Sequence, residues 1–416
     1  MTDSKRVGIC IAGSNGAVAT TMIAGAALMR RGLVPRHGMM TESPLCERLD
    51  LAPLDELVFG GWDLRGDSAY DAAVEHNVVP PHVLDKVKDE LEAIRPWPAV
   101  ASQRYLGAMA GKNLVVVDNF REEIAALAAN IEEFKLKHRL ARVVMVNLTS
   151  TERYTEVEDV HRTLVAFEAG LDASDPRISP AMKYLYVACQ LGIPHCNFTP
   201  SLSKIPALEE LAERRGVPIA GEDGKTGQTM LKTVLAPGFV VRSLQVDGWY
   251  STNILGNNDG LVLDDPGSNK TKVSSKSQCL DDILGYTVPS HQVRIDYYRP
   301  RGDAKEAWDS IDLIGFLGER MQLKINFLCK DSILAAPLVF DLVRLLDLAK
   351  RHKERGIQRQ LSVFFKAPYH ASGERAVHDL FKQQALLEAW IDQVASKANG
   401  VARAPADAVT SATAAG

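Results

Sequence analysis

A glycine turn close to the N-terminus constrains the fold most strongly. Val7–Ala12 is a short apolar run that predicts a buried strand. The turn Gly13-Ser14-Asn15-Gly16 follows it, and small residues with helical spacing continue to about Arg31. A strand, a glycine turn and a helix in this order form the opening unit of a doubly wound α/β sheet. We therefore expect the chain to begin with a domain of this class.

Elements of both kinds follow along the chain. Up to about residue 221, apolar runs predict strands at 114–117 and 143–146, and helical spacing predicts helices at 122–136, 184–191 and 207–215. Runs rich in β-branched or aromatic residues then predict a sheet with strands at 240–244, 293–298 and 322–329. A strong helix begins near Leu334. The last segment, 398–416, has little to bury and is predicted to be a disordered tail.

Composition argues against several classes of protein. Of the 416 residues, 46% are hydrophobic and 24% are charged, which is ordinary for a globular chain with a large core. The formal net charge of -4 shows no basic excess, so we expect neither nucleic acid nor a membrane as a partner. We expect no signal peptide, and no apolar run approaches the roughly 20 residues that span a bilayer. The six cysteines lack zinc spacing, so we expect reduced, mostly buried thiols in a cytoplasmic protein, and no metal site.

The glycine turn itself allows two interpretations. Its backbone N–H groups could hold a dinucleotide pyrophosphate at a helix N-terminus, or it could be a plain tight turn. The full G-x-G-x-x-G motif is absent, because Cys10 and Ala12 stand where more glycine is expected. No acidic residue clearly ends a second predicted strand, which leaves Glu42 as a weak candidate for the ribose. Asp63, after Gly60-Gly61-Trp62, either contacts ribose or adenine or caps a helix after a turn.

Two further segments have side chains suited to a sugar phosphate. Gly221–Thr229 contains three glycines, two threonines and Lys225 ahead of a helix pattern, so it could cradle a phosphate or be an exposed loop with a Thr cap. Asn253–Gly260 combines three asparagines and an aspartate around two glycines, which suits recognition of hydroxyl groups. Lys270, Lys272 and Lys276 follow. Such lysines either form a solvated face or counter an oxyanion and carry a proton.

Three shorter signals are ambiguous alone. Asp303 could cap a helix, with Glu306 completing a capping-box pair. Asp331-Ser332, upstream of Pro337, indicates a helix start. Lys366 is a lone lysine after two aromatic residues.

Together these segments resemble the myo-inositol-1-phosphate synthase family, from Val7 to about Leu387. The strongest match is Asn253-x-Leu-Gly-Asn-Asn-Asp-Gly followed by Lys272 and Ser275-Lys276-Ser277. Further matches are Gly302-Asp303-x-Lys305, Cys329-Lys-Asp331-Ser332-x-Leu-Ala-Ala-Pro337, Gly60-Gly61-Trp62-Asp63, Thr151-Glu-Arg-Tyr154 and Thr226-Gly-Gln-Thr229.

The resemblance implies an α/β fold, in which a Rossmann-type NAD-binding domain (1–229 and 334–397) carries an inserted α+β domain (230–333) for catalysis and tetramerisation. It implies that the cofactor is bound by Gly13, Ser14, Asn15, Gly16, Asp63, Thr151, Asp223, Asn258, Asp259, Gly302, Asp303, Asp331 and Ser332. It implies that the substrate is bound by Thr226, Gly227, Gln228, Asn253, Asn257 and Lys276. Lys272, Lys305, Lys366 and Lys276 would be the catalytic residues.

The implied reaction makes sense of the lysines. In that family NAD oxidises C5 of D-glucose 6-phosphate, C6 loses a proton and attacks the C1 aldehyde, and C5 is reduced again to give 1D-myo-inositol 3-phosphate. Lys272 and Lys305 are expected at the C5 oxygen, Lys366 at the C1 oxygen and Lys276 at the phosphate. A lysine or the substrate phosphate could take the C6 proton. The resemblance also implies a homotetramer, formed through the second domain's sheet, that serves inositol and phospholipid biosynthesis.

Departures from the family pattern fall on the cofactor side. The glycine turn has one glycine fewer, Ser150 replaces an asparagine, Asn197–Pro200 replaces a glycine-rich segment, and Arg104-Tyr105 stands where Asp-Phe is common. Two alternatives therefore stay open. The chain could be a paralogue that acts on another sugar phosphate or stops at oxidation, or an inactive NAD-binding scaffold.

Overall fold

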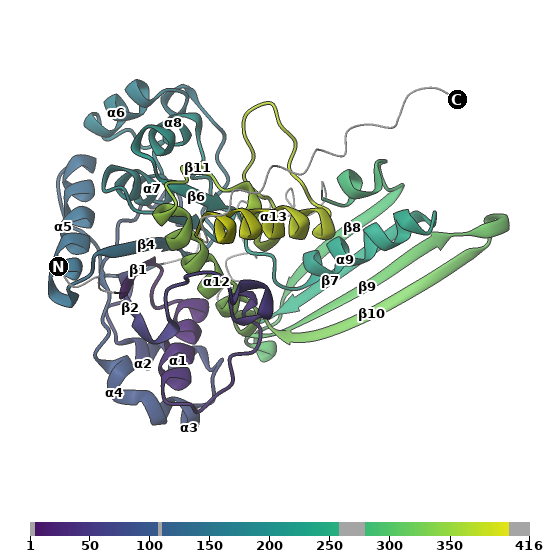
Figure 1. The fold of residues 1–416 in the computed structure, drawn as a ribbon, viewed down its shortest axis with the longest axis horizontal. Helices are drawn as coiled ribbons and strands as arrows, with labels where there is room; N and C mark the ends of the chain where they lie inside the picture. Colours follow the sequence, from purple (N-terminus) through teal and green to yellow (C-terminus); the bar gives the residue numbers. More distant parts are fainter. Residues whose placement is uncertain (1–4, 107–109, 258–278, 399–416) are drawn as a thin grey trace.

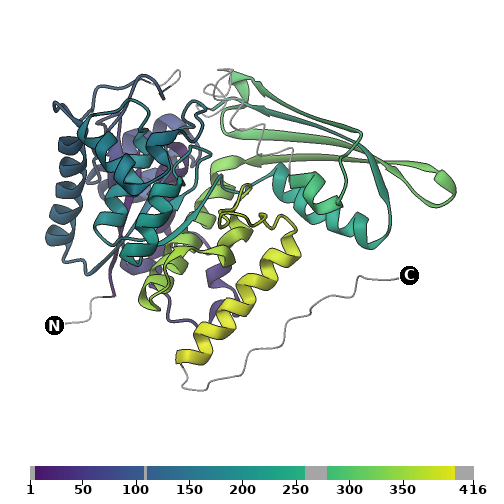
Figure 2. The same cartoon turned by 90° about the horizontal axis from the view of Figure 1, so that it is seen from above.

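A computed structural model describes residues 5–106, 110–257 and 279–398. It contains a seven-stranded sheet and a four-stranded sheet. Figure 1 shows the smaller sheet projecting to one side of the larger α/β body, and Figure 2 shows the same arrangement from above. The expected α/β class is confirmed.

The larger sheet is parallel throughout, with the strand order β11-β6-β5-β4-β1-β2-β3. Its strands are β1 (Val7–Ala12), β2 (Leu57–Asp63), β3 (Trp97–Pro98), β4 (Arg142–Asn147), β5 (His195–Asn197), β6 (Pro218–Gly221) and β11 (Gly356–Ile357). Strands β1 to β6 have the order of a doubly wound dinucleotide-binding sheet, in which ligands bind at the carboxyl ends of the strands, where the order reverses. That position lies between β1 and β4.

Helices cover both faces of this sheet. One face packs α1 (Ala17–Arg30), α12 (Asp331–Arg351) and α13 (Leu380–Ala398) into a single apolar cluster. The other face carries α5 (Phe120–His138), α7 (Pro180–Gln190) and α8 (Pro206–Arg215). Helices α2 (Ala69–His76), α3 (Pro81–Leu84), α4 (Lys88–Glu92) and α6 (Leu164–Asp172) also belong to this part of the molecule. Helix α8 ends where predicted, at Gly216, whose φ of 62° suits glycine.

The smaller sheet has the order β10-β9-β7-β8. Its strands are β7 (Gln245–Leu255), β8 (Ser290–Tyr297), β9 (Ala304–Ile314) and β10 (Arg320–Lys330). Strand β7 runs parallel to β8 and antiparallel to β9. Helix α9 (Gln228–Val241) packs Ala236 and Phe239 against Trp249 and Ile311 on one face of this sheet.

Several predicted elements differ from the structure. The predicted strand at 240–244 is the end of α9 and the turn after it, because the apolar face of the helix continues to Phe239 and outweighs the β-propensity of two valines. The predicted strand at 114–117 is only a single bridge from Leu114 to Ala99. Strand β2 was missed, because Gly60 and Gly61 suggested a turn. The predicted tail begins one residue early, since Ala398 is the last residue of α13, and 399–416 lie outside the described residues.

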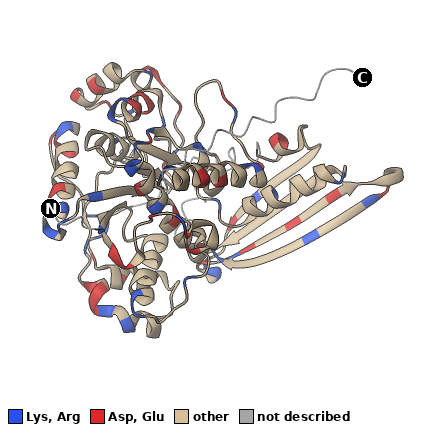
Figure 3. Ribbon diagram, viewed as in Figure 1, with Lys and Arg blue, Asp and Glu red and all other residues tan. Residues whose placement is uncertain are grey.

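Charged residues of both signs are distributed over the described molecule. Figure 3 shows Lys and Arg interspersed with Asp and Glu over both parts of the molecule. Among the helices of the described ranges, none is long and apolar enough to cross a membrane.

Candidate active site

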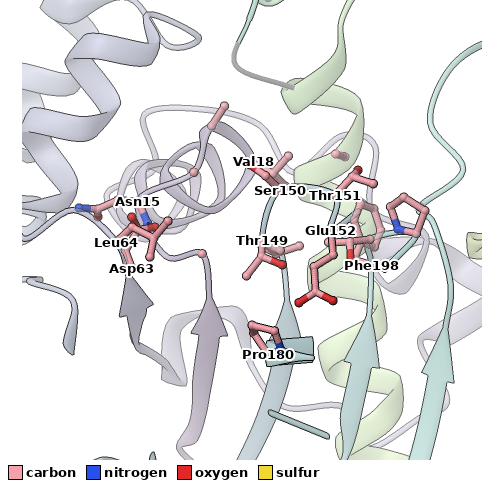
Figure 4. Close-up of a pocket in the computed structure, with 18 of the residues that line it drawn as sticks. Asn15, Val18, Asp63, Leu64, Thr149, Ser150, Thr151, Glu152, Pro180 and Phe198 are labelled. Carbon is pink, nitrogen blue, oxygen red and sulfur yellow. The ribbon is translucent and has the colours of Figure 1, made fainter. Parts of the chain in front are cut away.

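One cavity joins the carboxyl ends of the parallel strands to the base of the smaller sheet. Gly13, Asn15 and Asp63 line its first end, and Asp223 and Lys366 line the other. Figure 4 shows Asn15 and Asp63 together on one side, with Thr149, Thr151 and Glu152 of the segment that follows β4 across from them. The cavity therefore lies at the position where a sheet of this topology binds its ligand.

The glycine turn is held rigidly against β2. The N–H groups of Gly13 and Ser14 donate to the Trp62 carbonyl at 2.8 and 3.1 Å. Gly13 has a φ of +83°, and a Cβ there would lie 2.8 Å from the Leu148 carbonyl oxygen, so only glycine fits. Gly16 is the N-cap of α1, and its first turn has no side-chain cap among the described residues. Free N–H groups at a helix N-terminus favour an anion such as a pyrophosphate.

Asp63 ends β2, which corrects its helix-cap interpretation and the choice of Glu42 as the acidic residue at the second strand. Its carboxylate accepts from the backbone N–H groups of Asn15 at 2.8 Å and Arg65 at 3.0 Å, and burial raises its pKa. It caps no helix, because Ser68 caps α2. Glu42 is not at a strand end; it pairs with Arg344 at 2.6 Å.

The segment after β4 places a second acidic residue at the cavity wall. Thr151 and Glu152 are both buried there. One carboxylate oxygen of Glu152 accepts from the Ala181 N–H at 2.9 Å, and the other has no partner in the described part of the chain. Burial raises the pKa of Glu152 to about 7. In the sequence this residue stands out only as part of the Thr151–Tyr154 match, which implies no role for it.

At the opposite end, Lys366 and Asp223 form a buried ion pair with an Nζ–Oδ1 distance of 2.6 Å. Both line the cavity. Asp223 adopts a φ of 59°, and Gly224 follows it against the Phe198 ring, where a Cβ would lie only 2.0 Å from the ring. The close approach explains why the loop after β6 requires glycine there.

A second lysine–aspartate pair joins β9 to the start of α12. Lys305 Nζ lies 3.4 Å from Asp331 Oδ1, and the Thr226 hydroxyl donates to the same oxygen at 2.9 Å. Asp331 begins α12, as the helix-start interpretation predicted. This arrangement brings the 221–229 loop, β9 and α12 together.

Asp303 organises the turn before β9. It accepts from the Ser332 hydroxyl at 2.8 Å, the Ser332 N–H at 3.2 Å and the Asn257 amide at 3.1 Å, and burial raises its pKa. Gly302 precedes it with a φ of 52°. The helix-cap interpretation of Asp303 and Glu306 is wrong, because both residues belong to a turn and strand whose pairing with β7 and β10 overrides the local capping pattern.

The loop from 221 to 229 opens α9 with Gly227 as the N-cap, and no side chain caps it in the described chain. The Thr-cap interpretation is therefore wrong. Lys225 is turned away and donates to Gln383 of α13 at 2.5 Å, so it does not join a phosphate cradle. The Gln228 amide donates to Asp309 at 3.0 Å and accepts from Asn253.

The structure thus places eleven of the predicted residues at the cavity wall: Gly13, Asn15, Gly16, Asp63, Thr151, Asp223, Thr226, Asn257, Asp331, Ser332 and Lys366. Asp303 and Lys305 lie behind this wall, in contact with Asn257, Ser332 and Asp331. Ser14, Gly227, Gln228, Asn253 and Gly302 are neighbours of these segments and are not among the lining residues. Four predicted site residues lie in 258–278, outside the described residues: Asn258, Asp259, Lys272 and Lys276. Among the described residues, no three His, Cys, Asp or Glu side chains are grouped to hold a metal ion.

Comparisons with known proteins agree on one family. A family model described as myo-inositol-1-phosphate synthase matches residues 7–392. Inositol-3-phosphate synthase 1 of Bacteroides thetaiotaomicron is 42% identical over 403 residues, covering 92% of this chain and 94% of that protein. Inositol-3-phosphate synthase 1 of Oryza sativa is 29% identical, covering 93% and 85%. The crystal structure of inositol-3-phosphate synthase from Caenorhabditis elegans matches with a TM-score of 0.89 at 25% identity, covering 94% and 86%.

Proposed function

The chain belongs to the myo-inositol-1-phosphate synthase family, and we propose from its site that it converts D-glucose 6-phosphate to 1D-myo-inositol 3-phosphate with NAD. The enzyme is an isomerase, since the cofactor ends the cycle unchanged. One observation carries this function. Two lysine–aspartate pairs meet at the far end of a cavity that begins at a dinucleotide-type glycine turn: Lys366 and Asp223 are buried and line it, and Lys305 pairs with Asp331, which also lines it.

The residues at the first end fit NAD. The buried Ser14 hydroxyl has no partner in the described chain, and the first turn of α1 is uncapped, so both can take the pyrophosphate. Asp63 stands at the end of the second strand, where an acidic residue binds the ribose hydroxyls of NAD. Gly13, Asn15, Gly16 and Thr151 complete this end. When bound, NAD accepts a hydride from C5 of the sugar and returns it in the last step.

The lysines are proposed to stabilise oxyanions on the sugar. An ammonium group fixed in a dry site stabilises negative charge on oxygen without reorganising. We assign Lys305, together with Lys272, to the C5 oxygen, and Lys366 to the C1 oxygen. Asp223 and Asp331 hold the two described lysines in place, and Asp303 with Ser332 fixes the turn that leads into the strand carrying Lys305. Gly302, Asn258 and Asp259 are proposed to complete the nicotinamide side.

The substrate phosphate is proposed to bind at the start of α9. Thr226, Gly227 and Gln228 offer a hydroxyl and backbone N–H groups at an uncapped helix N-terminus. Lys276 would add a positive charge, and Asn253 and Asn257 would contact hydroxyl groups. The phosphate would then lie beside both lysine–aspartate pairs, because Thr226 shares Asp331 with Lys305.

We also propose a cytoplasmic homotetramer assembled through the smaller sheet, with 230–333 as the catalytic and oligomerisation domain and 1–229 with 334–397 as the NAD-binding domain. The free, mostly buried cysteines support a reducing compartment. Strand β10 supports assembly, because none of its residues is buried and it exposes Leu328 and Met321 by 60% and 45%. A monomer measured by light scattering would contradict the assembly.

The function is tested by incubating the protein with glucose 6-phosphate and catalytic NAD. We expect an inositol phosphate to accumulate without net NADH, detected by phosphorus NMR. Accumulation of NADH without a cyclic product would favour an enzyme that stops at oxidation. Tight NAD binding with neither outcome would favour the scaffold.

A further inference from the structure

The face of the smaller sheet that packs against α9 changes from apolar to polar toward the active site. Along β7, Trp249, Ser251 and Asn253 point to this face in turn, since alternate residues share a face. On β9, Ile311 and Asp309 lie opposite Trp249 and Ser251. All five are buried. Asp309 therefore places a carboxyl group inside the layer between helix and sheet, where the catalytic proposal gives it no part.

Each oxygen of Asp309 has its own donors. The Trp249 indole N–H and the Ser251 hydroxyl donate to Oδ1 at 2.7 and 2.6 Å. The Gln228 amide donates to Oδ2 at 3.0 Å, and the Gln228 carbonyl oxygen accepts from the Asn253 amide. The side-chain carbonyl oxygen of Asn253 is the last group in this row of hydrogen bonds, and it is buried without a partner in the described residues.

The chemistry of these groups allows only one orientation for each side-chain amide in this row of hydrogen bonds. An indole N–H can only donate, and an ionised carboxylate can only accept. The NH2 end of Gln228 must therefore face Asp309, which turns its carbonyl oxygen toward Asn253. The NH2 end of Asn253 must face that oxygen, which leaves its own carbonyl as the terminal acceptor. The buried Lys232 of α9 also lies close enough to interact electrostatically with Asp309.

We propose that Asp309 is a positioning residue that sets the orientation of the Gln228 and Asn253 amides. Asn253 then presents its side-chain carbonyl oxygen to a hydroxyl donor of the bound sugar. The inference rests on the proposed function and deepens it. It assigns Asn253 to a sugar hydroxyl, since a carbonyl oxygen repels a phosphate oxygen. It also leaves Gln228 to meet the phosphate through its backbone N–H, because its buried side chain is turned toward Asp309 and Asn253.

The first test removes the acceptor. Asp309→Asn keeps the shape of the side chain but turns an NH2 group toward one of the donors from which Asp309 accepts a hydrogen bond. We expect the dissociation constant of glucose 6-phosphate from the enzyme–NADH complex to rise about 10- to 100-fold, measured by calorimetry. The affinity for NADH should stay within about twofold, since the cofactor end is untouched. Asp312→Asn, three residues along β9 and outside this chain of bonds, is the matched control.

The second test restores the order of donors and acceptors between positions 309, 228 and 253. In Asp309→Asn combined with Gln228→Glu, the new amide can donate to the new carboxylate, which can still accept from Asn253. Gln228→Glu alone sets two carboxylates against each other. The double variant should therefore bind sugar phosphate more tightly than either single variant. Additive losses would overturn the proposed direction.

The third test uses 2-, 3- and 4-deoxyglucose 6-phosphate. The unmodified protein should bind one of them about 10-fold or more weakly than glucose 6-phosphate. That preference should disappear in Asn253→Ala and fall in Asp309→Asn, which a merely structural role would not produce. Equal binding of all analogues by the unmodified protein, or a preference unchanged in Asn253→Ala, would overturn the inference. Failure of the proposed function would show separately, as sugar-phosphate binding without turnover.

Discussion

The two ends of the cavity present different kinds of polar group. At the cofactor end, the glycine turn and the first turn of α1 offer backbone N–H groups, with Asp63 ordering the loop. At the sugar-phosphate end, lysines and carboxylates are buried as pairs, as in Lys366 with Asp223. Backbone dipoles suit a ligand whose charge is constant, whereas ammonium groups suit oxygens whose charge changes during reaction. The difference predicts that the ends can be damaged independently.

Removing a lysine from the sugar-phosphate end should have the largest effect. For Lys305→Ala we expect turnover of glucose 6-phosphate to fall about 1000-fold or more, because one fixed oxyanion partner is lost. The affinity for NADH should be unchanged within about twofold, as followed by nucleotide fluorescence. Lys382→Ala, whose side chain is 77% exposed on α13, should keep full turnover. Equal loss of turnover and NADH affinity in Lys305→Ala would contradict independent ends.

A substitution at Asp63 should damage the cofactor end alone. The Asp63 carboxylate accepts hydrogen bonds from the backbone N–H groups of Asn15 and Arg65. In Asp63→Asn, the new NH2 group must face one of these two donors. We expect NAD to bind about 10- to 100-fold more weakly. Turnover at saturating NAD should stay within a few-fold. Asp55→Asn, at a 57% exposed side chain, controls for loss of charge.

Glu152 sharpens the comparison, because it is a buried carboxyl at the cavity wall that pairs with no lysine side chain at hydrogen-bond distance in the described residues. Burial raises its pKa from 4.5 to about 7, so its stabilising contribution is complete below pH 4.5 and is lost as the pH rises to about 7. Glu152→Gln should therefore raise the free energy of unfolding at pH 8 by up to about 3 kcal/mol and leave it nearly unchanged at pH 4.5. Urea denaturation of the ligand-free protein at both pH values measures this. An equal effect at the two pH values would show that the carboxyl does not titrate differently on folding.

The smallest effect is expected at Ser14. Its buried hydroxyl lacks a partner among the described residues, so Ser14→Ala should not lower the stability of the ligand-free protein. If the hydroxyl meets the cofactor, NAD affinity should fall about 2- to 10-fold. Calorimetry with NAD and thermal unfolding without it measure the two effects. A loss of stability with unchanged NAD affinity would give the hydroxyl a structural role instead.

Local patterns predicted much of the fold. The first strand–turn–helix unit and helix α8 follow from apolar spacing and glycine position, which neighbouring residues determine. Strand β2 was missed because its glycines serve tertiary packing. A Cβ on Gly61 would lie 2.1 Å from the Ile11 carbonyl oxygen, and no local rule reveals such a contact.

The site was less accessible to residue-by-residue reasoning. Lys366 and Asp223 are 143 positions apart, and Lys305 and Asp331 are 26 apart, so their pairing depends on the folded chain. Only the family resemblance placed them in one site. Asp309 and Glu152 received no role from the sequence, because a single carboxylate in a strand or loop has no distinctive pattern.

The packing of α12 against α1 has a consequence for synthesis of the protein. Both helices bury their apolar faces in one cluster, yet α1 ends at Arg30 and α12 ends at Arg351. A ribosome adding about 5–20 residues per second would need about 15–60 s to make the intervening chain. Throughout that time the first βα unit lacks its covering helix. The nascent chain is therefore expected to be a chaperone client, and a ribosome stalled before residue 331 should carry a protease-sensitive N-terminal segment.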